Sequence, residues 1–144
     1  MQAIKYVFQQ HGDERGRLVA LEEFKDIPFE IKRVYYMYDT AEGISRGFHA
    51  HKKLQQILVC IHGSVDITLD NGKERKMVSL EKPYEGLYVS NSMWREMSNF
   101  SDGAVLLVMA SELYDENDYI RDYEEFLEYV KNCGDTSIAE EVLK

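Results

Sequence analysis

Residues 43–63 read GISRGFHAHKKLQQILVCIHG, a stretch that places two histidines one residue apart and follows them with an apolar, β-branched run. On a β-strand, side chains at positions i and i+2 point to the same face of the sheet, so we expect His49 and His51 to project together. In a closed barrel that shared face can be the interior. The pair is therefore a candidate for half of a metal site or for proton transfer.

The chain around this stretch reads as short strands separated by turn signals. Runs rich in β-branched and aromatic residues, punctuated by Gly, Asn, Asp or Pro, predict strands at 4–8, 16–23, 31–38, 55–63, 64–72, 73–80, 85–90 and 104–111. Asp70, Asn71 and Gly72 stand between two alternating runs and predict a tight hairpin. Eight or more strands at this spacing predict an all-β sandwich or a small barrel.

A helical pattern follows the strands. Apolar residues recur at helical spacing across 118–132, which predicts one amphipathic helix that covers the barrel, and a short helix is expected near 137–143. The length of 144 residues and the hydrophobic content of 44% fit a single domain spanning 1–144.

Composition bears on several classes of function. The net charge of −9 disfavours nucleic-acid binding, because phosphate binding needs a basic face. Much of the acid lies after residue 111, so a local basic pocket elsewhere stays open. No signal peptide and no run of ~20 apolar residues is visible, which predicts a soluble, cytoplasmic protein without a membrane partner. Cys60 and Cys133 form no CxxC pair, and we expect free thiols without a chemical role.

The spacing within residues 43–63 resembles the first cupin motif, G-x5-HxH-x3,4-E-x6-G. Gly43, five residues, His49-x-His51, four residues, Gln56, six residues and Gly63 match every interval. One identity differs, because Gln56 stands where the motif has Glu. The resemblance implies a cupin jelly-roll barrel with the C-terminal helix packed on it.

The second cupin motif, G-x5-PxG-x2-H-x3-N, should supply the last metal ligand. With its glycine on Gly86, Ser92 takes the place of Pro, Trp94 that of Gly and Met97 that of His. Two imidazoles, one neutral amide and one thioether are a poor ligand set for Fe, Mn or Zn. We therefore expect no metal and no other cofactor. An unperturbed imidazole pKa of ~6.5 suits general acid–base catalysis at neutral pH.

Four longer strings carry a closer resemblance: DERGRLVALEE (13–23), FEIKRVYYMYD (29–39), RGFHAHKKLQQILVCIHGS (46–64) and MASELYDENDYIRDYEEFL (109–127). They resemble the sugar-nucleotide 3,4-ketoisomerases, cupins that act without a metal on 4-keto-6-deoxyglucose linked to thymidine diphosphate (dTDP). The resemblance implies a homodimer and a reaction that moves the ketone from C4 to C3 through an enediol(ate). It also implies a role in deoxyamino-sugar biosynthesis for a surface polysaccharide, such as lipopolysaccharide or an S-layer glycan.

The matching positions suggest catalytic roles through this resemblance. His49 matches the family base, and His51 on the same strand face is expected to orient it or to relay a proton. Alternation along 31–38 places Arg33 and Tyr35 on one face of that strand. Tyr35 also matches a family tyrosine fourteen residues before the first histidine, so we expect it to be a proton relay or a hydrogen-bond donor.

Arginines are the expected diphosphate ligands, because their planar donors fit phosphate oxygens. Arg46 matches the phosphate arginine of an RGxH string in the related 3,5-epimerases. Arg15 resembles an N-terminal arginine of the same enzymes, and Arg33 shares the predicted inward face. Gln56 is expected to hydrogen-bond the substrate or His51. The residues close by in sequence without an assigned role are Lys52, Lys53, Trp94 and Arg95.

Two other functions stay open at this point: a 3,5-epimerase acting on the same sugar nucleotide, and a non-catalytic sugar-binding cupin. A metal-dependent dioxygenase is disfavoured by Gln56 and Met97. The string RGFHAHKKL resembles the galacto-forming ketoisomerases, so dTDP-3-keto-6-deoxygalactose is the expected product. The gluco product stays open as well, because the outcome depends on how His49, His51 and Tyr35 are placed around C4.

Overall fold

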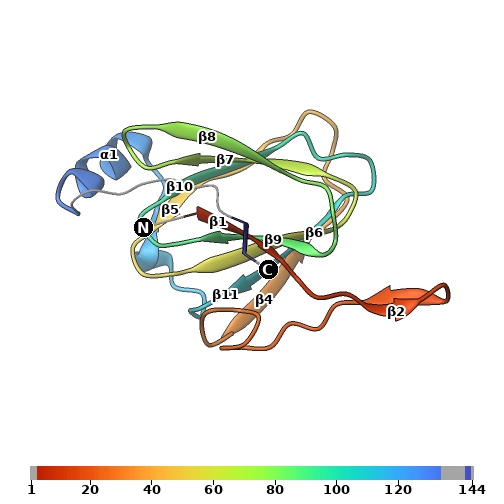
Figure 1. Cartoon of the computed structure of the whole chain (residues 1–144). Helices are drawn as coiled ribbons and strands as arrows, with labels where there is room; N and C mark the ends of the chain where they lie inside the picture. Colours follow the sequence, from red (N-terminus) through yellow and green to blue (C-terminus); the bar gives the residue numbers. More distant parts are fainter. Residues whose placement is uncertain (1–2, 134–141, 144) are drawn as a thin grey trace.

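The computed structural model describes residues 3–133 and 142–143. All but two of its described strands form two sheets that face each other (Figure 1). One sheet has the order β13 (Val142–Leu143), β1 (Ala3–Val7), β9 (Glu85–Val89), β6 (Gln56–His62), β11 (Val105–Ala110), β4 (Arg33–Met37). The other has the order β12 (Tyr119–Ile120), β5 (Arg46–His51), β10 (Trp94–Ser98), β7 (Val65–Asp70), β8 (Arg75–Leu80). Neighbouring strands are antiparallel, apart from β1 and β13, and the architecture confirms the predicted all-β cupin fold.

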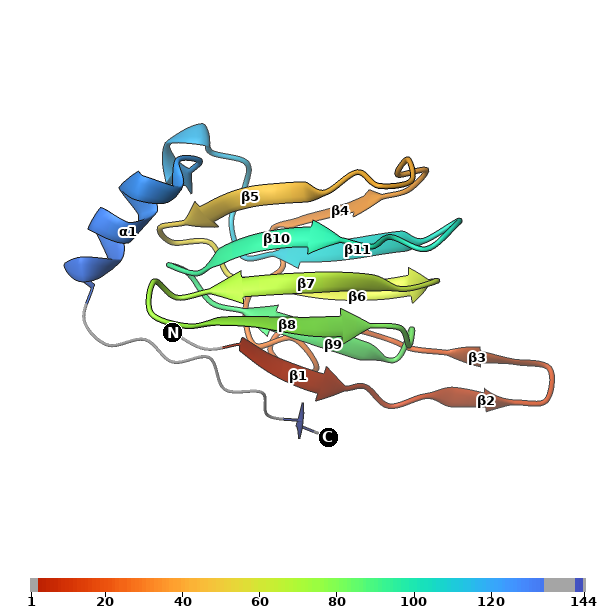
Figure 2. The ribbon, with the colours of Figure 1, turned by 90° about the horizontal axis from the view of Figure 1, so that it is seen from above.

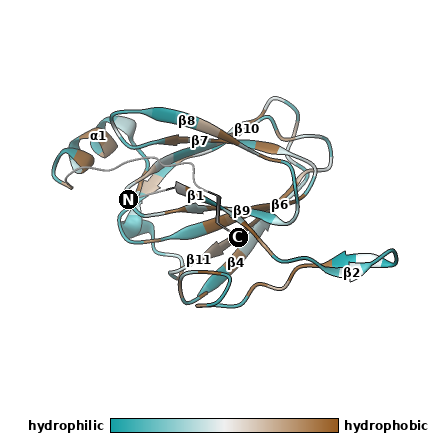
Figure 3. Ribbon diagram, viewed as in Figure 1, coloured by the Kyte–Doolittle hydropathy of each residue, from teal (hydrophilic) through white to brown (hydrophobic). Residues whose placement is uncertain are grey.

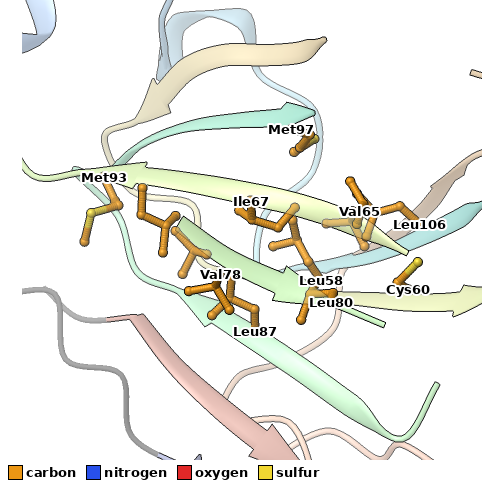
Figure 4. Packing of buried hydrophobic residues seen from close by; sticks show 13 residues of the cluster. Leu58, Cys60, Val65, Ile67, Val78, Leu80, Leu87, Met93, Met97 and Leu106 are labelled. Carbon is orange, nitrogen blue, oxygen red and sulfur yellow. The ribbon is translucent and has the colours of Figure 1, made fainter. Parts of the chain in front are cut away.

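An apolar core lies between the two sheets (Figure 4). It contains Leu58, Cys60, Val65, Ile67, Leu69, Val78, Leu80, Leu87, Val89, Met93, Met97, Leu106 and Val108. Burial of each large aliphatic side chain in such a core contributes about 1.5–3 kcal/mol to folding. Cys60 packs here as a small apolar residue, and burial raises the pKa of its thiol, which keeps the thiol protonated and unreactive.

A second apolar layer covers the outer face of the six-stranded sheet. Its buried members are Phe8, Ile27, Phe29, Ile57, Val59 and Met109. The predicted strand over 16–23 is wrong beyond residue 18, because β3 (Gly16–Leu18) pairs with β2 (His11–Asp13) and the residues that follow form only an isolated bridge, from Glu23 to Ile27. Val19 and Leu21 are apolar because they pack on this layer, and not because they belong to a longer strand.

The β2–β3 hairpin extends away from the two sheets (Figure 2). All residues of its two strands are exposed, and β2 is drawn mainly in hydrophilic colours in Figure 3. The hairpin therefore contributes nothing to the core of this chain.

The C-terminal helix α1 (Tyr123–Lys131) begins later than the pattern at 118–132 predicted. Asp122 caps it by accepting a hydrogen bond from the Glu125 N–H, and Phe126 is its one buried residue. Among the described residues, no helix is long and apolar enough to cross a membrane.

Two further expectations about local structure need correction. Residues 116–118 form a 3-10 turn, η1 (Glu116–Asp118), and Tyr119 and Ile120 form β12, because they pair with His51 and Ala50. The expected helix at 137–143 lies outside the described residues apart from 142–143, which form β13 and not a helix. Strand β10 was missed, because Arg95 and Glu96 give its centre a charged, loop-like sequence.

Candidate active site

A β-bulge in β5 sets the direction of the histidine pair. Across from β10, Arg95 pairs with His49 and Glu96 with Gly47, so Phe48 is an extra residue in β5. Gly47 and Phe48 have φ angles of 91° and 58°. A Cβ on Gly47 would meet the Arg95 carbonyl oxygen at 2.9 Å, so only glycine fits here without a shift. Bulges of this kind redirect side chains beside functional sites.

The two imidazoles lie against each other and against Tyr119. The ring centroids of His49 and His51 are 4.9 Å apart, and the Tyr119 ring lies 5.1 Å from His49 and 4.3 Å from His51. Burial, followed by the charge of Arg95, lowers the pKa of His49 to about 4 and also lowers the pKa of His51 well below its ordinary value. Both rings are therefore neutral at pH 7, the form in which an imidazole accepts a proton.

Asp118 determines which nitrogen of His51 carries the proton. The His51 ring is fully buried, and its Nδ1 lies 3.1 Å from Oδ2 of Asp118. A carboxylate only accepts hydrogen bonds, so neutral His51 donates from Nδ1 and leaves Nε2 unprotonated. The backbone N–H groups of Lys53 and Leu54 donate to the same carboxylate at 2.8 and 3.3 Å and hold it in place. The arrangement is that of an aspartate that orients a histidine for proton transfer.

The opposite sheet contributes Tyr35 from β4 and Gln56 from β6. The Gln56 side chain is fully buried, where its Nε2 donates to Tyr35 Oη at 2.8 Å and its Oε1 accepts from Arg95 Nη1 at 2.5 Å. Burial raises the pKa of the Tyr35 hydroxyl, which therefore keeps its proton at neutral pH. Burial also lowers the pKa of Arg95 to about 10, so its guanidinium is still charged at pH 7.

A pocket of about 370 Å³ opens beside these groups. It is lined by Arg33, Tyr35, Met37, Arg46, Gly47, His49, Met97, Tyr114, Tyr119 and Arg121. In the described part of the chain, Nε and Nη2 of Arg33 are buried without a hydrogen-bond partner. Arg121 donates to Glu116 at 2.6 and 2.9 Å. Three arginines that have one carboxylate partner among the described residues make the pocket locally cationic, in a chain whose net charge is −9.

The structure places the residues chosen from the sequence at three depths. The pocket wall holds Arg33, Tyr35, Arg46 and His49. His51 and Gln56 lie behind that wall, fully buried, and the Gln56 amide bonds Tyr35 and Arg95 and does not bond His51. Arg15 lies in the turn of the β2–β3 hairpin, where it is exposed and pairs with Asp13 at 2.6 Å. It does not belong to this pocket.

Besides Met37 and Tyr114, which line the pocket, four residues of the site had no role in the sequence analysis: Arg95, Asp118, Tyr119 and Arg121. Three of them fall in a segment whose pattern predicted a helix, and their real positions follow from the pairing of β12 with β5. The fourth, Arg95, does have a signal in the sequence. Gln56 is neutral where the motif has a carboxylate, which indicates that the partner of residue 56 is not a metal ion. In the structure that partner is Arg95.

The metal that cupin motifs hold does not fit these residues. Gln56 Oε1 is engaged by Arg95, the thioether of Met97 stands where the motif has its last histidine, and the buried Arg95 guanidinium brings a positive charge to the same positions. Within residues 3–133 and 142–143, no three His, Cys, Asp or Glu side chains gather into a set that could bind a metal ion. No step of the chemistry below passes through a metal.

The protein is a two-sheet cupin, and its cationic pocket is lined by a neutral imidazole and a tyrosine hydroxyl. Its class is therefore that of a cupin with an acid–base site. The chain belongs to the family described as FdtA: WxcM-like, C-terminal, which it matches over residues 2–131. That finding confirms the family resemblance of the sequence analysis.

Three relatives show how much of the chain the likeness covers. The TDP-4-oxo-6-deoxy-alpha-D-glucose-3,4-oxoisomerase of Aneurinibacillus thermoaerophilus is 52% identical over 123 residues, which cover 85% of this chain and 88% of the relative. A 3,4-ketoisomerase from Helicobacter canadensis has a TM-score of 0.88 and 52% identity, covering 90% of this chain and 97% of that one. A His-to-Asn variant of the 3,4-ketoisomerase QdtA from Thermoanaerobacterium thermosaccharolyticum was crystallised with TDP-4-keto-6-deoxyglucose; its TM-score is 0.89 at 45% identity, covering 90% and 94%.

Proposed function

We propose that this protein is a 3,4-ketoisomerase that converts TDP-4-keto-6-deoxyglucose into its 3-keto isomer in deoxysugar biosynthesis. The observation that carries the proposal is the meeting of three kinds of group in one pocket. His49 is a neutral base, Tyr35 a protonated hydroxyl, and Arg33, Arg46 and Arg121 are cations. Family membership and identities near 50% to ketoisomerases favour this reaction over 3,5-epimerisation and over binding without catalysis.

The reaction needs only proton transfers. The C4 carbonyl acidifies the hydrogen on C3, and His49 takes that proton while the electron pair moves toward the C4 oxygen. Tyr35 donates its proton to this oxygen, and the intermediate is an enediol. Tyr35 then takes back a proton from the C3 oxygen as His49 returns one to C4. C3 is oxidised, C4 is reduced, and every proton is accounted for without a redox cofactor.

The remaining groups bind the substrate or support the base. Arg33, Arg46 and Arg121 are the proposed ligands of the diphosphate, since charge-assisted arginine contacts to phosphate are strong. His51 supports His49 from behind, with its unprotonated Nε2 free to share or relay a proton. Gln56 acts through Tyr35 and not by direct contact with the sugar.

Incubation with TDP-4-keto-6-deoxyglucose, followed by proton NMR, tests the function and the product together. We expect the spectrum to show the signal of a new C4 proton, from a 3-keto sugar of galacto configuration. A 3-keto product of gluco configuration would support the isomerase activity and contradict the expected configuration at C4. Inversion at C3 and C5 with the C4 ketone intact would identify an epimerase. An unchanged substrate that still binds identifies a binding protein.

The proposed mechanism also requires no metal. Activity should persist after dialysis against a chelator, because Gln56 Oε1 is engaged by Arg95 and Met97 replaces the motif's last histidine, which leaves His49 and His51 as the two remaining ligands of the motif. Elemental analysis should find no stoichiometric Fe, Mn or Zn. A metal near one per chain, with activity that is lost on its removal and restored on its return, would contradict this part of the proposal.

We further propose that the protein is a cytoplasmic homodimer. The outer face of β4 exposes Val34 and Tyr36 to 53% and 61%, an apolar surface at the edge of a sheet that a second copy can cover. The β2–β3 hairpin reaches away from its own chain and carries Arg15 at its turn (Figure 2). In a dimer this arginine can reach the substrate bound by the other copy. Analytical ultracentrifugation tests the dimer, and a monomer at micromolar concentration contradicts it.

Arg46 offers a test of the anion site. Arg46→Ala should raise KM for the nucleotide sugar with little change in kcat, because a phosphate contact serves ground and transition state alike. Lys25, which is exposed and pairs with Glu22 outside the pocket, provides the control variant Lys25→Ala. If calorimetry shows that Arg46→Ala binds free TDP as tightly as the wild-type protein does, Arg46 is not a ligand of the diphosphate.

A further inference from the structure

Arg95 is a buried cation that forms no ion pair among the described residues, and the carboxylate whose charge acts on it is that of Asp118. Its side chain has no exposed surface, and its guanidinium donates to Gln56 Oε1 at 2.5 Å and to the Met93 carbonyl at 2.8 Å. Its Nε has no hydrogen-bond partner in the described part of the chain. An unpaired buried charge opposes folding, so a site that retains one gains something other than stability from it.

The charge lies among the positions that hold the metal in a cupin. Arg95 is opposite His49 in the β5–β10 register and bonds Gln56, which stands at the motif's Glu position. Its charge also acts on His51 and on Tyr35. A guanidinium therefore stands where the fold family would place a divalent cation.

The contact with Arg95 fixes the direction of the Gln56 amide. A guanidinium only donates hydrogen bonds, so the amide must turn its oxygen to Arg95 and its NH₂ group to Tyr35. Tyr35 Oη then accepts from Gln56, which leaves the tyrosine's own proton free for the pocket that Tyr35 lines. A glutamate at position 56 would accept from both neighbours, capture the tyrosine proton and neutralise the guanidinium.

We propose that Arg95 and Gln56 replace the cupin metal with a fixed internal cation: Arg95 is a positioning residue that, through Gln56, presents the Tyr35 hydroxyl as a donor to the substrate oxygen. The charge also favours the neutral, proton-accepting form of His49. This inference rests on the proposed isomerase function for the step that Tyr35 performs. It accounts for the one identity in residues 43–63 that departs from the cupin motif.

The first test is Gln56→Glu, with Gln55→Glu as its matched control. Gln55 bears the same amide one residue away, accepts from the Tyr88 hydroxyl at 2.6 Å and lies outside the pocket. Gln56→Glu should lower kcat by about 10²-fold, the usual effect of losing one oriented donor to a developing oxyanion. KM and the Kd for TDP should stay within about twofold, and Gln55→Glu should behave as wild type.

A double-mutant cycle separates positioning from general damage. If Gln56 acts through Tyr35, Gln56→Glu should cost little further activity in a Tyr35→Phe background. Equal losses in both backgrounds, or a Gln56→Glu enzyme within twofold of wild type, would overturn the positioning role.

The second test measures the effect of the Arg95 charge on His49 and does not depend on an activity assay. Arg95→Met keeps approximate volume and removes the cation, while the other charged groups that act on His49, Arg121 and Glu116, stay in place. The NMR titration midpoint of His49 should rise by about one pH unit. The melting temperature reports the stability cost separately, because the substitution removes a buried charge but leaves Gln56 Oε1 and the Met93 carbonyl without their donor. An unchanged His49 midpoint in the folded variant would show that Arg95 is structural.

If the wild-type protein does not isomerise the sugar, the proposed function fails and the presentation of Tyr35 to a substrate oxygen fails with it. The effect of Arg95 on His49 is then judged by the NMR titration alone.

Discussion

The space between the two sheets has an apolar part and a polar part that are buried to the same degree. Leu58, Ile67 and Leu106 are fully buried in the first, as are His51 and Arg95 in the second. Yet all the buried side-chain N and O atoms without a hydrogen-bond partner in the described chain, apart from the Thr40 hydroxyl, belong to Arg33, His49, His51 and Arg95. One part of the interior stabilises the fold, and the other part holds groups that oppose folding until a substrate partners them.

This contrast predicts that substitutions in the two parts have opposite signatures. The largest effect is expected for His49→Asn, which keeps approximate size and polarity and removes the base. The kcat should fall by about 10²–10⁴-fold with KM little changed, as for the loss of a general base. In D₂O the wild-type product should carry deuterium at C4, and the variant should lose exchange at C3 together with turnover. Steady-state kinetics and NMR provide the measurement.

The fold of His49→Asn should be intact, because the substitution removes a buried imidazole without leaving a charge. A variant that turns over within a few-fold of wild type would assign the base to another residue, with His51 and Tyr35 as the next candidates.

Leu58→Ala should show the reverse signature. The side chain is fully buried in the apolar part, and its truncation should lower the free energy of unfolding by about 2–5 kcal/mol. Urea denaturation followed by tryptophan fluorescence measures this loss. Well below its melting temperature, the variant should keep kcat within about twofold of wild type. A kcat loss comparable to that of His49→Asn would mean that the two parts of the interior are not separate.

The apolar part of the interior could be predicted from the sequence, whereas most contacts of the polar part could not. Alternation and turn residues predict the apolar part well, because each core residue needs only a strand and a face. The histidine pair also follows from spacing, since i and i+2 share a face. The partners in the polar part are distant in sequence: Asp118 lies 67 residues from His51, and Arg95 lies 39 residues from Gln56. No local pattern encodes such pairings, and the helical pattern at 118–132 concealed the first of them.

Asp118→Asn sharpens the comparison with a smaller effect. An amide can donate to Nδ1 of His51, which would move the ring proton to Nε2 and block the nitrogen that faces the site. Because His51 could then no longer support the base, kcat should fall by roughly 10- to 100-fold, less than on loss of the base itself. Asp122→Asn is the matched control, because asparagine caps a helix as well as aspartate does. If both variants keep wild-type kcat, the tautomer of His51 does not contribute to turnover.

The smallest expected effect is a difference in how stability depends on pH. The pKa of His49 is about 4 in the folded protein and ~6.5 in an unfolded chain, so the unfolded state binds more protons between these values. The stabilising contribution of the neutral ring is therefore complete above pH 6.5 and is lost as the pH falls toward 4.

Between pH 7.5 and 5.5, linkage predicts a loss of about 1.4 kcal/mol for this one ring. His51 adds a loss in the same direction, because its pKa is also lowered by burial. Urea denaturation at the two pH values should therefore show a smaller decrease for His49→Asn than for wild type, by about 1.4 kcal/mol. Leu58→Ala should start from a lower stability and show the full wild-type decrease, since it leaves both imidazoles buried. Equal decreases in all three proteins would contradict a neutral, buried His49, and with it the physical distinction between the polar and the apolar part of the interior.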